Sequence, residues 1–128
     1  MSINILFVDD NEGITNMLTR LFRQSQYSIT VANSGKQALK MMNEKPFTLI
    51  VSDQHMPGMC GELFLEKAHQ RQPQAVKAIF SGDYDQYQKK HKENIVKYFI
   101  PKPCFDDELV DCIEGLVQYS IEEPNKVV

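Results

Sequence analysis

Five polar side chains suited to phosphate and metal chemistry stand at the ends of four short apolar runs. They are Asp9, Asp10, Asp53, Ser81 and Lys102. Carboxylates that gather in one place repel each other unless a cation lies between them, and Mg²⁺ prefers oxygen ligands of this kind. A hydroxyl and an ammonium group nearby would complete a clamp for a phosphoryl group, whose transfer depends mainly on positioning and charge neutralisation. One carboxylate can then act as the nucleophile and become an aspartyl phosphate.

The elements that would position these side chains alternate along the chain. Apolar runs predict strands over residues 3–8, 27–32, 47–52, 75–80 and 95–100. Continuous runs of this length are typical of strands buried on both faces of a parallel sheet. After the first run the apolar residues recur with helical spacing, at Ile14, Met17, Leu18, Leu21 and Phe22. Further helices are predicted after Ser34, from Leu63 to before Pro73, over the very polar segment 83–94, and from Asp106 or Asp107 to Val117.

This alternation predicts an α/β fold. Strand–helix–strand connections are right-handed, so the strands would form one parallel sheet with helices on both faces. We expect a flavodoxin-like, doubly wound (βα)5 three-layer sandwich with the strand order 2-1-3-4-5. All five polar side chains then lie at the carboxyl edge of the sheet, where such folds bind ligands. We expect one domain over residues 1–121, with 122–128 a polar tail or the start of a linker.

Composition and charge argue against several classes of protein. The net charge of −3 disfavours a general nucleic-acid-binding protein, so we expect no direct contact with nucleic acid. No apolar run approaches the length of a membrane span, and the N-terminus lacks a basic segment. We therefore expect no membrane association, no signal peptide and a cytoplasmic location. Cys60, Cys104 and Cys112 show no C-x-x-C spacing, which favours reduced thiols over a metal site.

A set of motifs resembles the receiver domain of bacterial two-component response regulators, the CheY-like family. The set consists of Asp9-Asp10, Asp53, Met56-Pro57-Gly58, Gly61, Ser81 and Lys102-Pro103, and the resemblance extends from about Ile3 to Val117. By this resemblance Asp53 is the phosphoacceptor, which takes a phosphoryl group from a sensor histidine kinase or a phosphotransfer protein. The chain would then be a phosphorelay signalling module rather than a turnover enzyme, with only self-phosphotransfer and self-dephosphorylation.

The resemblance also implies a divalent metal site. Mg²⁺ or Mn²⁺ would bind Asp10 directly, Asp9 largely through water, and Asp53. The backbone carbonyl of His55 would be a further ligand, so the imidazole need not take part. Carboxylate and carbonyl oxygens suit a hard cation that keeps waters and phosphate oxygens as its other ligands.

A switch would follow from the charge of the phosphoryl group, which adds roughly −1.5 to −2 in place of one carboxylate. Ser81 and Lys102 would be drawn toward it, and Phe99 would change rotamer to fill the space that Ser81 leaves. The Lys102–Pro103 peptide bond is expected to be cis, as this family has it. The fourth strand, the helix after it, the fifth strand and the last helix would then present a changed surface. That surface would face an effector that the sequence does not identify, or a second copy in a phosphorylation-dependent homodimer.

The chain departs from the family pattern beside the predicted site. Gly82 stands where Ala is usual, which gives the loop after Ser81 more backbone freedom. Cys60 stands where Asp is common, and we interpret it as a variation in packing or capping rather than a redox group. His55 and Asp83 flank the phosphoryl site, at positions where side chains tune dephosphorylation.

Three other functions are weighed against this interpretation. A Mg²⁺-dependent phosphatase of the haloacid dehalogenase type needs two acids spaced D-x-D, which the sequence Asp9-Asp10-Asn11 breaks. A receiver that only binds partners is disfavoured by the intact set of five polar residues, and a flavin-binding module by the lack of a Ser/Thr/Gly-rich loop after the first strand. The stretch 99–109 resembles receivers joined to cyclic-di-GMP-type output domains. A stand-alone receiver and the N-terminal module of such a regulator both stay open.

Overall fold

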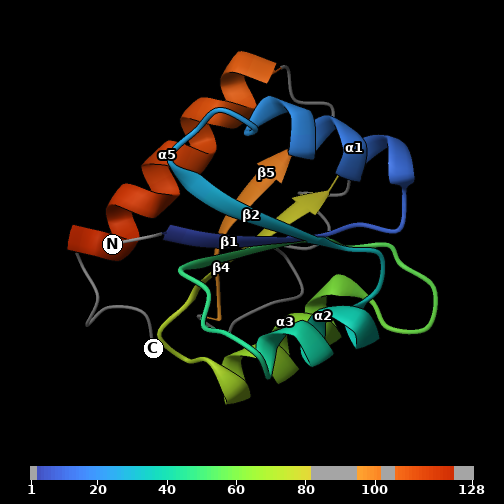
Figure 1. The fold of residues 1–128 in the computed structure, drawn as a ribbon. Helices are drawn as coiled ribbons and strands as arrows, with labels where there is room; N and C mark the ends of the chain where they lie inside the picture. The colour runs from blue at the N-terminus through green and yellow to red at the C-terminus, as the bar shows by residue number, and fades with distance from the viewer. Residues whose placement is uncertain (1–2, 82–94, 102–105, 123–128) are drawn as a thin grey trace.

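The computed structural model describes residues 3–81, 95–101 and 106–122, and it contains a five-stranded parallel sheet with the order β2-β1-β3-β4-β5 (Figure 1). The strands are β1 (Ile3–Val8), β2 (Tyr27–Ala32), β3 (Leu49–Asp53), β4 (Val76–Ser81) and β5 (Val96–Pro101). The described helices are α1 (Glu12–Leu21), α2 (Gly35–Met42), α3 (Gly61–Arg71) and α5 (Asp106–Glu122). The predicted fold class and strand order are confirmed.

Helices cover both faces of the sheet. α1 and α5 lie on one face, and α2 and α3 lie on the other (Figure 1). Along β1, Ile5 and Phe7 pack into the cluster with α1 and α5, whereas Leu6 and Val8 pack into the cluster with α2 and α3. This is the two-residue period of a strand buried on both sides. It is also the reason why an unbroken apolar run correctly indicated a parallel sheet.

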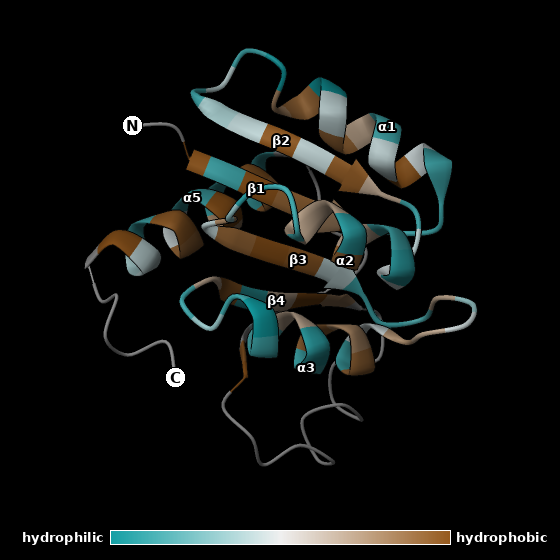
Figure 2. Cartoon of the chain, turned by 60° about the horizontal axis from the view of Figure 1, so that its bottom comes forward, coloured by the Kyte–Doolittle hydropathy of each residue, from teal (hydrophilic) through white to brown (hydrophobic). Residues whose placement is uncertain are grey.

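The hydropathy of each strand follows its place in the sheet. β3 lies between β1 and β4 and is buried at every residue, and Figure 2 shows it hydrophobic along most of its length. β2 lies at an edge of the sheet, and Ala32 alone among its residues is buried. The polar residues that follow β1 and end β3 are therefore carried by the most firmly packed part of the fold, which suits a site that needs fixed geometry.

Polar side chains set the starts of the first two helices. The Asn11 Oδ1 atom accepts hydrogen bonds from the backbone N–H groups of Gly13 (2.8 Å) and Ile14 (3.3 Å). Because of this cap, α1 begins at Glu12, before its apolar stripe. The Ser34 hydroxyl accepts a hydrogen bond from a backbone N–H in the first turn of α2 (3.1 Å), so the predicted cap of the second helix is confirmed.

The boundaries of the elements differ from the prediction by a few residues. β3 begins at Leu49 rather than at residue 47, and it ends on Asp53, which pairs with Phe80 of β4 in the sheet register. The carboxylate is thus part of the strand and not of the loop. The helix predicted over 83–94 lies outside the described residues, as does Cys104. Among the described helices, none combines the length and apolar character that a membrane span requires.

Candidate metal and phosphate site

Three of the five predicted polar residues lie together at the carboxyl edge of the sheet. Asp9 follows β1 and Asp53 ends β3, and these neighbouring strands are in register, with Val8 opposite Ser52. One carboxylate oxygen from each of Asp9, Asp10 and Asp53 lies within 4.8 Å of the others. The sheet register therefore produces the cluster of acids, although Asp53 lies 43 or more positions after the other two in the chain.

The three carboxylates differ in how they are held. Asp9 is buried, its Oδ1 atom accepts a hydrogen bond from the backbone N–H of Asn11 (3.0 Å), and its own N–H donates to the carbonyl of Ala32 (3.0 Å). Asp53 is also buried, with 8% of its surface exposed, while Asp10 is exposed. The cluster thus has two fixed acids set into the fold and one at the solvent boundary. A cation held by acids of this kind would keep waters as its remaining ligands on the exposed side.

The loop between β3 and α3 forms the wall beside Asp53. Met56 anchors it, because this side chain is buried in the cluster with α2 and α3. Gly58 has a φ of +82°, a backbone conformation that favours glycine. Gly61 has no room for a side chain, since a Cβ atom there would collide with the carbonyl oxygen of Asp53. His55, between these points, is exposed. Met56 of the sequence motif is therefore explained by its burial, Gly58 by its backbone conformation, and Gly61 by its close packing against the backbone of Asp53.

The donor set fits a hard divalent cation. All three groups are carboxylates, which together bring a formal charge of −3 when ionised. Crowded like charges are unfavourable without a compensating cation, and oxygen-only sites with a few acids favour Mg²⁺ or Mn²⁺ over softer metals. The residues present therefore fit the predicted metal. The carbonyl of His55 as a ligand stays a prediction.

The remaining predicted site residues lie wholly or partly outside the described residues. Ser81 is the last residue of β4, so its backbone lies at the same edge as Asp53, and Phe99 pairs with Ile79 in the register of β5 and β4. The side chains of Ser81 and Phe99 lie outside the description. So do Lys102, Pro103 and the peptide bond between them, together with Gly82 and Asp83. Their proposed roles, like the cis bond, stay predictions.

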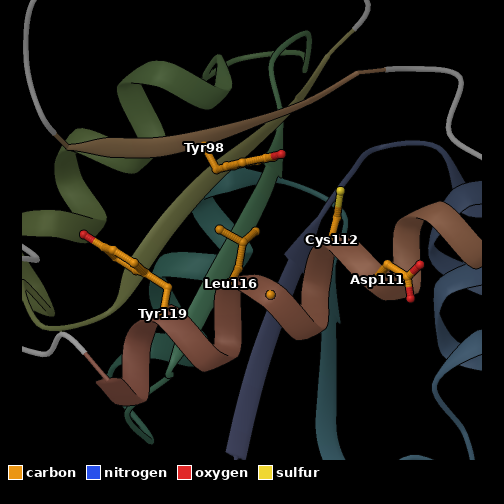
Figure 3. A pocket seen from close by; sticks show the side chains of 6 residues that line it. Tyr98, Asp111, Cys112, Leu116 and Tyr119 are labelled. Atoms are coloured by element: carbon orange, nitrogen blue, oxygen red, sulfur yellow. The ribbon is translucent and has the colours of Figure 1, made fainter.

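A second hollow, away from the acids, opens between β5 and α5. Figure 3 shows Tyr98 of β5 lying across from Cys112, Leu116 and Tyr119 of α5. Burial, and then the nearby carboxylates of Asp111 and Glu108, raise the pKa of the Cys112 thiol above its ordinary value. Sequence reasoning placed the switching surface in this part of the fold but did not find the hollow, because it depends on how one strand and one helix meet.

Sequence reasoning also missed Gln54, which directly follows Asp53. Its side-chain Oε1 atom accepts a hydrogen bond from the backbone N–H of Glu62 at the start of α3 (3.0 Å). The available signal was Cys60, because a thiol at the position before a helix leaves the first N–H groups without the usual oxygen acceptor.

Comparison with known proteins gives one consistent family. The family model described as the response regulator receiver domain matches residues 5–114 of this chain. The hydrogenase transcriptional regulatory protein HoxA of Cupriavidus necator is 28% identical over 116 residues, which are 89% of this chain and 24% of HoxA. The chain spans about a quarter of the length of the first curated relatives that it matches.

Solved structures share the fold over nearly the whole chain. A structure of adenylate cyclase from Rhodopirellula baltica superposes with a TM-score of 0.88 at 28% identity and covers 98% of this chain and 95% of that chain. The signal receiver domain of an HD domain-containing protein from Pseudomonas fluorescens Pf-5 gives a TM-score of 0.87 at 26% identity, over 96% and 100% of the two chains.

Proposed function

The chain belongs to the response regulator receiver family, and on this premise we propose that Asp53 accepts a phosphoryl group in two-component signal transduction. The donor would be the phosphohistidine of a sensor histidine kinase or of a phosphotransfer protein. One observation carries the proposal, namely the three carboxylates whose oxygens lie within 4.8 Å of one another at the carboxyl edge of the sheet. Such a cluster is unfavourable by itself and is explained by a bound cation and phosphate.

The environment of each acid supports a division of roles. Asp53 would be the nucleophile, because it ends the central strand β3 and has only its outer side open to a donor. A carboxylate oxygen of Asp53 would form the new bond to phosphorus while the bond from phosphorus to the donor breaks and its electrons leave with the donor. Asp10 would bind the cation directly, and Asp9, which already accepts the N–H of Asn11, would act largely through water.

A bound Mg²⁺ would neutralise part of the charge that accumulates when a phosphoryl group approaches three acids. We propose the backbone carbonyl of His55 as its further ligand. Ser81, at the end of β4, and Lys102, which follows β5, would bind the phosphoryl oxygens.

Phosphorylation would be read at the surface formed by β4, β5 and α5. Movement of Ser81 toward the phosphate, followed by Phe99, would alter β5 and with it the hollow lined by Tyr98 and Tyr119 (Figure 3). An effector, a cyclic-di-GMP-type output domain, or a second copy of the chain would bind one state of this surface better than the other. Two-state coupling of this kind accounts for signalling without turnover of a substrate.

The proposal is tested by phosphorylation with a small donor. Purified protein is incubated with acetyl phosphate in the presence of Mg²⁺ or of a chelator, and its intact mass is measured. We expect one phosphoryl group per chain with Mg²⁺, none with the chelator, and none in Asp53→Asn. Glu114→Gln, which removes an exposed acid of α5, is the matched control and should behave as the wild type. Multiple turnover of a phosphate ester would instead favour the aspartyl-nucleophile phosphatase. A full adduct in Asp53→Asn would contradict the proposal.

A further inference from the structure

The start of α3 is held differently from the starts of the other helices. Asn11 caps α1 and Ser34 caps α2, each with a side-chain oxygen that accepts backbone N–H groups. Cys60 occupies the same position before α3, in an extended conformation that suits a cap, but its side chain makes no capping hydrogen bond in the described structure. A thiol is a weak acceptor, so the first turn of α3 needs an oxygen from elsewhere.

Gln54 supplies that oxygen from the other end of the loop. Its Oε1 atom accepts the N–H of Glu62 at 3.0 Å, and its backbone carbonyl accepts the N–H of Gly61 at 2.9 Å. A single residue therefore satisfies two N–H groups at the start of α3. Because the backbone of Gly61 is hydrogen-bonded to the backbone of Gln54, the segment 54–61 forms a closed ring.

This ring is in contact with the proposed phosphoacceptor. The Cα atom of Gly61 lies so close to the carbonyl of Asp53 that a Cβ atom at this position would collide with it. The start of α3, the ring and the backbone of Asp53 are thus packed as one unit. His55 follows Gln54 within the segment 54–61, so we expect its backbone to be held by the two hydrogen bonds that close this segment.

We propose that Gln54 is a positioning residue for the metal site, which acts by holding the loop after Asp53 through the start of α3. This proposal rests on the proposed function, because the cation is expected at Asp9, Asp10 and Asp53. Loss of the Gln54 side-chain acceptor leaves the ring closed by the backbone hydrogen bond alone, which loosens it, lets the carbonyl of His55 turn away, and weakens the binding of the cation. A role in helix capping alone would change the start of α3 without changing the affinity for the metal.

The test removes the acceptor and then restores a cap by another route. Gln54→Met keeps the volume but not the acceptor, and Gln54→Met combined with Cys60→Ser places a hydroxyl where helix caps are usual. Amide hydrogen exchange at Gly61 and Glu62 is measured without metal, and Mg²⁺ binding is measured by calorimetry. Gln70→Met, an exposed glutamine of the same helix, is the matched control.

We expect Gln54→Met to exchange these amides about fivefold faster and to bind Mg²⁺ about fivefold more weakly, as the loss of one capping hydrogen bond suggests. The double variant should recover most of the amide protection and of the affinity, and Gln70→Met should match the wild type. Unchanged Mg²⁺ affinity in Gln54→Met, or unchanged amide exchange, would overturn this inference alone. A wild-type chain that binds no Mg²⁺ would overturn the proposed function together with it.

Discussion

The sheet has buried polar side chains at two edges, one at the amino ends of its strands and one at their carboxyl ends. The two groups differ in the kind of neighbour that surrounds them. At the amino edge, Gln72 and Lys77 are buried among partners that match them. At the carboxyl edge, Asp9 and Asp53 are buried beside each other and beside Asp10, so that like charges meet. Matched partners indicate a contribution to stability, whereas gathered carboxylates indicate a place where a cation can bind.

Gln72 is the clearest example of a buried polar side chain that is matched by hydrogen-bond partners. Its Nε2 atom donates to the carbonyls of Met42 and Lys45, both at 3.0 Å, and its Oε1 atom accepts the N–H of Phe47 at 2.8 Å. One amide thus joins the end of α3 to the segment between α2 and β3. All three partners are backbone groups that an apolar side chain could not satisfy.

Lys77 extends the same arrangement into β4. Its Nζ atom donates to the carbonyl of Gln72 at 2.7 Å and lies 3.1 Å from the Nδ1 atom of His69. The amine of Lys77 is fully buried, and hydrogen-bond partners of this kind offset the cost of burying it. At the carboxyl edge, a bound cation would balance the charge of the gathered acids.

The largest effect is expected at the amino edge. Gln72→Met removes three hydrogen bonds and leaves buried backbone groups without partners, so the free energy of unfolding should fall by about 3 kcal/mol. Urea unfolding followed by circular dichroism measures it, with the exposed Gln70→Met as the control. Below the unfolding transition, phosphorylation by acetyl phosphate should stay at the wild-type level. A loss of phosphorylation in folded Gln72→Met would show that the carboxyl edge depends on the hydrogen bonds at the amino edge.

The carboxyl edge should respond in the opposite direction. Asp10→Asn removes one of three crowded charges, so in metal-free buffer the free energy of unfolding should rise by about 0.5–1 kcal/mol. Mg²⁺ at one hundred times its dissociation constant should stabilise the wild type by about 2.7 kcal/mol, and Asp10→Asn should lose most of this gain at the same concentration. Thermal unfolding with and without Mg²⁺ measures both effects. The same response in Glu114→Gln, which lies on α5, would show that the effect is not local.

The smallest effect is expected at the hollow beside α5, where acids are near a thiol but do not form a cluster. Because the pKa of Cys112 is raised by burial and by Asp111 and Glu108, little reactive thiolate is present at neutral pH, and alkylation should accelerate as the pH rises. Asp111→Asn removes one negative charge, lowers this pKa, and should speed alkylation at pH 7 by about twofold. Iodoacetamide labelling of the Cys112 peptide measures the rate. Equal rates in the variant and the wild type would show that the carboxylate does not influence the thiol.

The sequence was sufficient for the fold and for the meeting of the acids. Both followed from local patterns, because unbroken apolar runs alternate with helical stripes and parallel strands end at a common edge. Once β1 and β3 are neighbours, Asp9 and Asp53 must lie close together. No knowledge of side-chain packing was needed for that step.

The roles of Gln54 and Gln72 could not be predicted in the same way. Gln72 stands at the end of a helix, where a polar residue is usually solvated, and its partners lie 25 to 30 residues earlier in the chain. Gln54 reaches a helix that starts seven residues later. The sequence indicates this role only indirectly, through the weak cap Cys60 before that helix. Hydrogen bonds of this kind depend on the approach of loops in the folded chain, which no periodicity records.

The central claim is that the carboxyl edge is a site for phosphorylation on one particular acid. Its most direct test is peptide mapping of the wild-type protein after incubation with acetyl phosphate and Mg²⁺. The account predicts an acid-stable, base-labile phosphoryl group on the peptide that contains Asp53, and on no other peptide. A phosphoryl group on Asp9, on Asp10 or on a histidine, or no label with Mg²⁺ present, would contradict it.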